Sequence, residues 1–292
     1  MNNVTRKGII LAGGTGSRLH PLTNVISKQL LPIYDKPMIY YALSTLMLAG
    51  IREFLIITTP RDLKSFKSLL GDGSQLGVVI NFEMQEKPNG IAEAFKIGKK
   101  FIGSSNVALI LGDNIFHGTS LLKLMNDSNT GQNGATIFAY SVSDPERYGI
   151  VEFDSEGRAL NIVEKPKSPK SSFAITGLYF YDNRVVEKAE MLNPSARGEL
   201  EITDLNNLYL KEKNLHVKVM SRGMTWLDTG KFDSLFEASG YIQTLQKRQG
   251  LMIGSPEEVA FRMGWINSET LKKNALKLKK SSYGKYLLKL VD

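Results

Sequence analysis

The chain contains no cysteine, and only three of its 292 residues are histidines. The lack of cysteine excludes disulfides and thiolate metal sites and suits a reducing cytosol. The histidines lie far apart in sequence and show no zinc-ligand spacing: His20, His117 and His216. Disulfide-stabilised folds and zinc modules are therefore not expected.

Long apolar runs are also lacking. No run approaches the ~20 residues needed to cross a bilayer. The polar segment Met1–Lys7 leads directly into an apolar stretch, so we expect neither a membrane anchor nor a signal peptide. No linker, repeat or low-complexity segment interrupts the chain. These features predict a globular protein of the cytoplasm.

The chain is basic, with a net charge of +8 and an isoelectric point near 9.4. Much of the excess lies near the C-terminus, in Lys272, Lys273, Lys277, Lys279, Lys280, Lys285 and Lys289. Few aromatic residues alternate with these lysines, so we expect a solvated helical face and no nucleic-acid partner. Anionic small-molecule substrates would explain some of the charge. Nucleic-acid binding stays open as an alternative, and a steep salt dependence of the affinity would mark it.

The first half of the chain alternates strand-like and helix-like segments. Strands are expected at Gly8–Ala12, Phe54–Thr59, Val78–Met84, Val107–Leu111 and Ala135–Val142. Helices are expected at Met38–Ala49, Arg61–Leu70, Ile91–Lys100 and Leu121–Asn126. This order predicts a Rossmann-like α/β fold, with a mostly parallel central sheet and helices on both faces. Ligands of such sheets bind at the carboxyl ends of the strands.

The pattern changes after about Tyr148. Shorter strands are expected at Ile150–Phe153, Leu160–Glu164, Phe173–Tyr181 and Leu215–Met220, and helices at Arg184–Leu192 and Thr203–Glu212. From Lys231 onward the chain is predicted to be almost wholly helical. We therefore expect one domain at residues 1–235, in two parts that divide near residue 148. A helical appendage at residues 236–292 follows it.

The segment Gly8–Leu19, followed by Ser27–Pro32, is the most informative part of the sequence. Its apolar strand ends at a turn with three glycines within the four residues Gly13–Gly16. Such a turn lets backbone N–H groups point into one concavity, where they hold phosphate oxygens. Arg18 and Lys28 add two cations a short distance downstream. The segment therefore predicts a triphosphate site.

Two common glycine loops do not fit this segment. A Walker A loop needs a lysine that does not follow Gly16, and a dinucleotide fingerprint needs a third glycine where this chain has Leu19. The whole string instead resembles the signature of the sugar-nucleotide pyrophosphorylases, the nucleotidyltransferases that act on sugar 1-phosphates. Further motifs follow in the family's order, and the resemblance covers roughly residues 6–265.

The resemblance implies a Mg²⁺-dependent reaction of dTTP with α-D-glucose 1-phosphate, which gives dTDP-glucose and pyrophosphate. This reaction would begin the synthesis of dTDP-deoxysugars such as dTDP-L-rhamnose. The nucleotide would bind to the part at about residues 1–148, and the sugar phosphate to the part at about 149–235. A UTP-using uridylyltransferase and a non-catalytic sensor of sugar nucleotides remain as alternatives. Thymine differs from uracil by one methyl, worth about 1–3 kcal/mol in an apolar pocket, so activity with UTP is also expected.

The family's nucleotide-binding positions carry over to Leu11, Gly13, Gly14, Thr15, Gly16, Gln29, Gln85, Pro88 and Gly90. Gln85 and Gly90 belong to the base-recognition loop. A side-chain amide there offers a donor to O4 of a pyrimidine and an acceptor to N3–H. A proline-glycine turn that leads into a helix is the structural alternative. Glu93 departs from the glutamine that is frequent at its position.

The resemblance also assigns the charged groups of the reaction. Arg18 would stabilise the pyrophosphate leaving group, Lys28 would contact the nucleotide phosphates, and Lys165 would steer the sugar phosphate. Asp113 and Asp228 match the family's metal-binding positions, although each could instead cap a helix or turn. Magnesium suits this pair because it binds carboxylate and phosphate oxygens and keeps water ligands.

The expected sugar-phosphate positions are Tyr148, Gly149, Glu164, Lys165, Thr176, Tyr179, Arg197 and Trp226. A glutamate is suited to accept hydrogen bonds from two sugar hydroxyls, and a lysine to bind a monoester phosphate. Close relatives are homotetramers that an end product such as dTDP-rhamnose inhibits at a second nucleotide site. The resemblance therefore implies a homotetramer assembled through the C-terminal helices, with Gly118, Arg222 and Arg262 at the second site.

Overall fold

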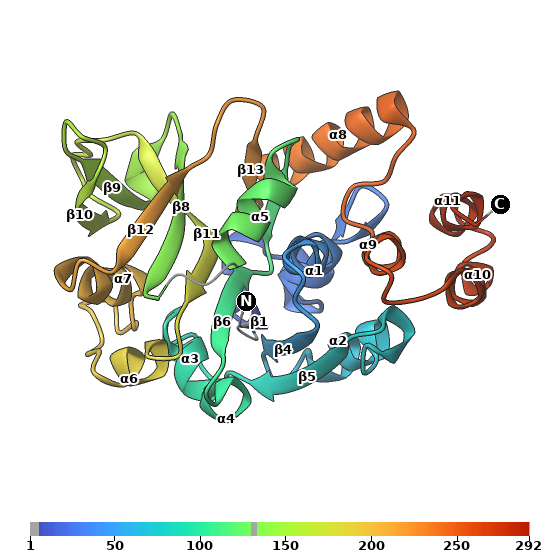
Figure 1. The fold of residues 1–292 in the computed structure, drawn as a ribbon, viewed down its shortest axis with the longest axis horizontal. Coiled ribbons are helices and arrows are strands. Elements are labelled where there is room, and N and C mark those ends of the chain that lie inside the picture. Colours follow the sequence, from blue (N-terminus) through green and yellow to red (C-terminus); the bar gives the residue numbers. More distant parts are fainter. Residues whose placement is uncertain (1–5, 130–132, 292) are drawn as a thin grey trace.

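The computed structural model describes residues 6–129 and 133–291. A nine-stranded sheet lies at its centre, with helices on both faces (Figure 1). The strands of this sheet are β1 (Arg6–Ala12), β4 (Glu53–Thr58), β5 (Val79–Met84), β6 (Asn106–Leu111), β8 (Ala135–Ser141), β9 (Gly149–Phe153), β10 (Ala159–Glu164), β11 (Phe173–Tyr181) and β12 (Leu215–Val219). Their order is β10-β9-β11-β6-β1-β4-β5, and β8 pairs with both β11 and β12.

Seven of these nine strands point in the same direction. β1 is parallel to β4 and β6, β4 is parallel to β5, and β8 is parallel to β12. β11 is antiparallel to β6, β8 and β9, and β10 is antiparallel to β9. Only β10 and β11 therefore run against the rest, and the predicted α/β class with a mostly parallel sheet is confirmed.

Two hydrophobic cores cover the two faces of the sheet. One contains side chains of α1 (Ile39–Leu48), α2 (Leu63–Leu70) and α5 (Leu121–Asn129). The other contains side chains of α3 (Glu93–Ile97), α4 (Lys99–Ile102), α6 (Val185–Glu190) and α7 (Ile202–Lys211). Successive side chains of a strand point to opposite faces, so Ile9 is buried in one core and Ile10 in the other. The apolar run before the glycine turn is thus an interior strand of the sheet, between β6 and β4, with both faces buried.

Most predicted strands and helices are present within a few residues, and one differs. The helix expected at Ile91–Lys100 is divided into α3 and α4 at Gly98. A Cβ at Gly98 would lie 3.0 Å from both the Ala94 carbonyl oxygen and Ile9 Cδ1. The backbone therefore approaches the sheet closely at this glycine, and the helix is interrupted there.

Two small antiparallel ribbons were not predicted. β2 (Pro32–Ile33) pairs with β3 (Lys36–Pro37). β7 (Asn114–His117) pairs with β13 (Thr225–Asp228), and the register places Asn114 opposite Asp228. This second ribbon brings the end of β6 next to a segment that is far away in sequence.

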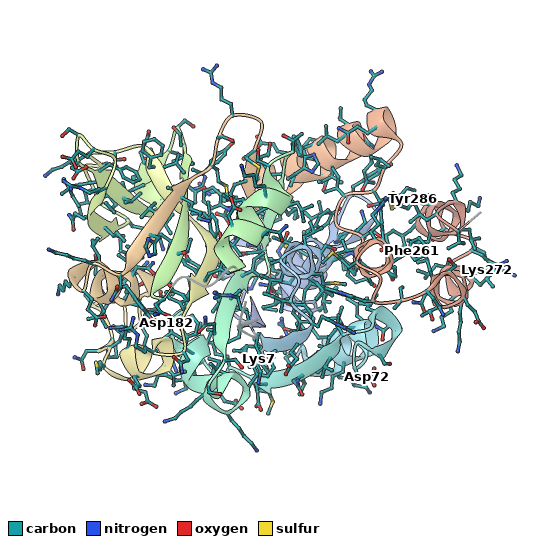
Figure 2. All side chains as sticks on the ribbon, in the orientation of Figure 1. Lys7, Asp72, Asp182, Phe261, Lys272 and Tyr286 are labelled. Atoms are coloured by element: carbon teal, nitrogen blue, oxygen red, sulfur yellow. The ribbon has the colours of Figure 1, made fainter. Side chains whose placement is uncertain are left out.

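The predicted helical C-terminus is confirmed. It consists of α8 (Phe232–Gln249), α9 (Pro256–Arg262), α10 (Ser268–Lys277) and α11 (Ser282–Lys289). Side chains of α9, α10 and α11 join the core that contains α1, and Asn274 Nδ2 donates to the Gln75 carbonyl at 2.8 Å. The seven C-terminal lysines are exposed, and Figure 2 shows Lys272 pointing outward from α10. The division of the chain after residue 235 stays a prediction.

Within residues 6–129 and 133–291, no helix is both long enough and apolar enough to cross a membrane.

Candidate active site

A cavity of 230 Å³ lies at the carboxyl end of β1. The loop Gly13–Leu19 lines it, together with Lys28, Gln29, Asp113 and Gly230. Gly16 has φ +61°, a left-handed conformation that favours glycine, and Thr23 Oγ1 donates to its carbonyl at 2.7 Å. The glycine turn and its two cations, Arg18 and Lys28, therefore line one concave surface, as a triphosphate site requires.

A second cavity of 200 Å³ shares Arg18 and Asp113 with the first. Six of the residues expected on the sugar side line it: Tyr148, Gly149, Glu164, Lys165, Tyr179 and Trp226. Asp228 lines it as well. Because the two cavities meet at Arg18 and Asp113, a ligand in one would lie next to a ligand in the other.

Asp113 lies in the turn between β6 and β7 and forms an ion pair with Lys28, whose Nζ lies 2.5 Å from its Oδ2. Asn114 Nδ2 donates to the other carboxylate oxygen at 2.9 Å. Burial alone would raise the pKa of Asp113, but the charge of Lys28 and these hydrogen bonds hold the pKa below its ordinary value. Asp113 is therefore ionised at neutral pH.

Asp228 lies at the end of β13, and its pKa is shifted in the opposite direction from that of Asp113. Burial and the neighbouring charge of Asp113 raise its pKa, against the lowering effect of Lys28, Arg18 and Arg147. Thr229 fixes this end of the ribbon, because its Oγ1 donates to the Asp113 carbonyl at 2.8 Å. Two partly buried carboxylates therefore repel each other at the junction of the two cavities.

The carboxylate oxygens of Asp113 and Asp228 are suitable ligands for a hard divalent cation. A dication between Asp113 and Asp228 would relieve the repulsion that raises the Asp228 pKa. Among residues 6–129 and 133–291, no group of three or more histidine, cysteine, aspartate or glutamate side chains could hold a metal. Magnesium tolerates such a site, since it takes one or two carboxylates and completes its shell with phosphate oxygens and water.

Glu164 ends β10 and makes a dense set of contacts. Its Oε2 accepts from Thr203 Oγ1 at 2.6 Å, and its Oε1 accepts from Arg197 Nη2 at 3.1 Å. Glu201 holds the same Arg197 nitrogen at 2.7 Å. Arg197 therefore positions Glu164 from outside the cavity lining.

Lys165 takes up an unusual backbone conformation beside Glu164. Its φ is +42°, which a residue with a side chain rarely adopts. Its backbone N–H donates to the Tyr148 carbonyl at 3.0 Å. Backbone strain of this kind concentrates at functional sites, and the turn directs the Lys165 side chain into the lining of the second cavity.

Asn114 joins three strands in the lining of the second cavity, and the sequence did not single it out. Its Oδ1 accepts from Trp226 Nε1 at 2.6 Å and from the Gly177 N–H at 3.1 Å. Tyr148 packs edge-on against the Trp226 ring, with centroids 5.1 Å apart. Burial and the charge of Asp228 raise the pKa of Tyr148 to about 12, so its hydroxyl keeps its proton at neutral pH.

Arg147 is a second residue of the lining that sequence reasoning missed. It pairs with Asp144, lies over the Tyr148 ring and places Nη2 3.7 Å from Asp228 Oδ2. Its position directly before Tyr148-Gly149, which the family motif does include, was the signal that could have revealed it.

Other expected residues lie outside the lining of these two cavities. Leu11 is in β1, Pro88 is exposed, and Thr176 is fully buried in β11. Gln85 and Gly90 contact each other, since Gln85 Nε2 donates to the Gly90 carbonyl at 3.3 Å. Gln85 also lies against the glycine turn, because a Cβ at Gly13 would meet its Oε1 at 2.6 Å.

A third cavity, of 450 Å³, lies between α1, β7, α5 and α9. Gly118 and Arg262 line it, while Arg222 is exposed outside the lining. Gly118 packs closely on the turn that carries Arg222, since a Cβ there would lie 2.5 Å from the Gly223 carbonyl oxygen. The three residues expected at a second nucleotide site are thus distributed around one cavity and its edge.

Comparisons with known proteins match nearly the whole chain. Residues 7–244 match the family described as nucleotidyl transferase. A glucose-1-phosphate thymidylyltransferase of Neisseria meningitidis is 56% identical over 285 residues, covering 98% of this chain and 99% of that protein. One of Mycobacterium tuberculosis is 56% identical over 290 residues, with the same coverage.

Solved structures agree with these matches. A Bacillus anthracis structure that carries the name glucose-1-phosphate thymidylyltransferase, in complex with sucrose, is 43% identical. It matches with a TM-score of 0.75 over 81% of this chain and 95% of that one. A UDP-glucose pyrophosphorylase with bound UDP-glucose matches at a TM-score of 0.71, over 82% of this chain and 99% of that one. At 24% identity, it supports the fold alone.

Proposed function

The chain belongs to the nucleotidyl transferase family, and on that premise we propose that it is a glucose-1-phosphate thymidylyltransferase. It would convert dTTP and α-D-glucose 1-phosphate to dTDP-glucose and pyrophosphate. One observation carries this proposal: the glycine-turn cavity and the Lys165 cavity meet at Arg18 and Asp113. A triphosphate and a sugar phosphate bound there would face each other at their reacting ends.

The chemistry is a direct displacement at phosphorus. A phosphate oxygen of the sugar attacks the α-phosphorus of dTTP in line, and the bond to the bridging oxygen of pyrophosphate breaks. A phosphate monoester has its second pKa near ~6 and is largely dianionic at pH 7. The nucleophile is therefore already deprotonated, and the residues of the site need only position and neutralise charge.

Each cation of the site has a place in this displacement. The glycine turn cradles the triphosphate, and Lys28 and Arg18 bind its phosphates and stabilise the pyrophosphate that leaves. Lys165 steers the sugar phosphate from the second cavity, while Glu164 accepts hydrogen bonds from sugar hydroxyls. Asp113 and Asp228 would hold a Mg²⁺ ion, which supplies neutralisation of the α-phosphate when bound.

Turnover over a grid of nucleotides and sugars tests this proposal. Pyrophosphate release is measured with Mg²⁺ for dTTP, UTP, CTP, ATP and GTP, each against several sugar 1-phosphates. The highest kcat/KM with dTTP and glucose 1-phosphate is expected, with appreciable turnover of UTP. A UTP optimum would favour a uridylyltransferase, and a folded protein that binds nucleotide without any turnover would favour a sensor.

The proposal also includes a second nucleotide site that regulates the enzyme and an assembly of four subunits. An end-product nucleotide such as dTDP-rhamnose would bind in the 450 Å³ cavity, and the protein would then feed dTDP-deoxysugar synthesis. We expect a homotetramer whose contacts include the C-terminal helices. Sedimentation checks the assembly, and a stable monomer would refute it. Arg262→Ala should weaken feedback inhibition and leave uninhibited turnover unchanged.

A further inference from the structure

The side chain of Glu93 contacts the amide of Gln85. Glu93 begins α3, and Gln85 directly follows β5. Gln85 Nε2 donates to Glu93 Oε2 at 2.7 Å and to the Gly90 carbonyl at 3.3 Å. Asn89 Nδ2 holds the other carboxylate oxygen of Glu93 at 2.8 Å. The carboxylate is thus fixed on both oxygens while it binds the amide.

These contacts determine which way the amide faces. A carboxylate and a backbone carbonyl can only accept hydrogen bonds. If the amide turned by half a rotation, its oxygen would face two acceptors and lose both bonds. The nitrogen of Gln85 therefore stays on the side of Glu93 and Gly90.

The amide oxygen consequently points toward the glycine turn. Gln85 Oε1 lies 2.6 Å from the position that a Cβ of Gly13 would occupy. Within residues 6–129 and 133–291, no side chain or backbone group donates a hydrogen bond to Oε1. Gln85 thus offers an acceptor beside the turn, while both of its N–H groups are already used.

The sequence-based expectation for Gln85 changes accordingly. The sequence predicts that the amide donates to O4 of the base and accepts from N3–H. With both N–H groups bonded to Gly90 and Glu93, it keeps only the second role. An acceptor suits thymine and uracil, which carry a hydrogen on N3, and opposes cytosine, whose N3 is itself an acceptor.

We propose that Glu93 is a specificity-determining residue that acts through Gln85: it fixes the amide with its oxygen toward the base and so excludes cytosine nucleotides. This inference rests on the proposed function, because it places the base at Gln85. Glu93 itself is a positioning residue and does not touch the nucleotide.

Replacing Glu93 with glutamine distinguishes a role in orienting the Gln85 amide from a role in packing alone. Glutamine has nearly the same shape as glutamate, yet it can present either an oxygen or an N–H₂ group to Gln85. The Gln85 amide could then turn and offer its nitrogen to N3 of cytosine. The protein would then discriminate less between uracil and cytosine nucleotides, although residue 93 would still form a hydrogen bond with Gln85.

Binding of UDP and CDP to Glu93→Gln provides the test, since the two share the same sugar and phosphates. Calorimetry on the full-length protein gives both dissociation constants without any need for turnover. We expect the preference for UDP over CDP to fall about tenfold, the scale of one exchanged hydrogen bond. Glu83→Gln is the matched control, because it makes the same charge change at an exposed residue of β5. It should keep the preference of the unmodified protein.

Two outcomes would overturn the inference. One is a Glu93→Gln preference equal to that of the unmodified protein. The other is an equal loss of affinity for both nucleotides, which would indicate a structural role only. If Glu93→Gln is unstable, Glu93→Ala gives the same comparison with a good helix former at the start of α3. Absence of turnover with every substrate would defeat the proposed function, whereas the binding preference would still decide the role of Glu93.

Discussion

Arg147 and Asp228 lie side by side in the lining of the second cavity, with Nη2 of the guanidinium 3.7 Å from Oδ2 of the carboxylate. Asp144 holds the same guanidinium, and the Tyr148 ring lies beneath it at 5.1 Å. Arg147 is therefore a second fixed cation near the place proposed for the sugar phosphate, in addition to Lys165.

The first prediction concerns this cation. Arg147→Ala should raise KM for glucose 1-phosphate about tenfold and change KM for dTTP little, since one charge-assisted contact contributes roughly 1.5–3 kcal/mol at most. Steady-state kinetics with each substrate varied in turn measure both constants. Arg158→Ala is a suitable control, because that side chain is 71% exposed and pairs with Asp154 away from the site. An unchanged KM for the sugar phosphate would remove Arg147 from the binding site.

The second prediction concerns Lys165 and Asp113, which contact opposite sides of the reaction centre in the proposed mechanism. Lys165→Ala and Asp113→Asn should each lower kcat by about 10²–10³, the usual effect of losing one preorganised charge. Single-turnover kinetics at saturating substrates test this, with circular dichroism to show that both variants fold. Near-normal kcat in both folded variants would contradict the assigned roles.

The third prediction compares two neighbouring glycines. A Cβ at Gly13 would meet Gln85 Oε1 at 2.6 Å, whereas Gly14 has open space around that position but a φ of +93°. Gly13→Ala should therefore raise KM for dTTP and change the melting temperature little, because the far end of a side chain is displaced. Gly14→Ala should instead destabilise the fold by about 1 kcal/mol, the scale of backbone strain. Melting temperatures and the KM for dTTP are measured for both variants. A larger loss of stability in Gly13→Ala than in Gly14→Ala would contradict this prediction.

The fourth prediction concerns stability and pH. Burial lowers the pKa of His117 below its ordinary value of 6.5, and its ring packs edge-on against Tyr241 at 6.1 Å. Between the lowered pKa and 6.5, the unfolded chain binds more protons than the folded one, so stability rises with pH and is lost on acidification. His117→Gln should flatten this slope. Melting temperatures measured from about pH 5 to pH 7.5 would show it, and parallel curves for both proteins would contradict it.

Local patterns were sufficient to predict the fold and the family. The run before Gly13 alternates between two cores, and β4 and β6 are each largely apolar and buried. Such signals depend on neighbouring residues, so they can be read without knowledge of the tertiary structure. The family inferred from the glycine turn and its cations is confirmed by the match over residues 7–244.

The parts that were missed depend on residues far apart in sequence. β7 and β13 have four residues each, and neither stands out as a strand until it meets the other. Asn114 becomes important only through its bonds to Trp226 and Gly177. The orientation of Gln85 likewise depends on Glu93, which the sequence marked only as a departure from the family.

The ribbon of β7 and β13 also determines when during its synthesis this protein could become active. The glycine turn and Asp113 leave the ribosome early, and their strands β1, β4 and β6 can pair while translation continues. Asp228 and Thr229, which complete the junction of the two cavities, follow roughly ten seconds later at typical elongation rates. A nascent chain that stops in between would contain the glycine turn and Asp113 but not Asp228, so it would lack one of the two carboxylates that the proposed mechanism requires for turnover.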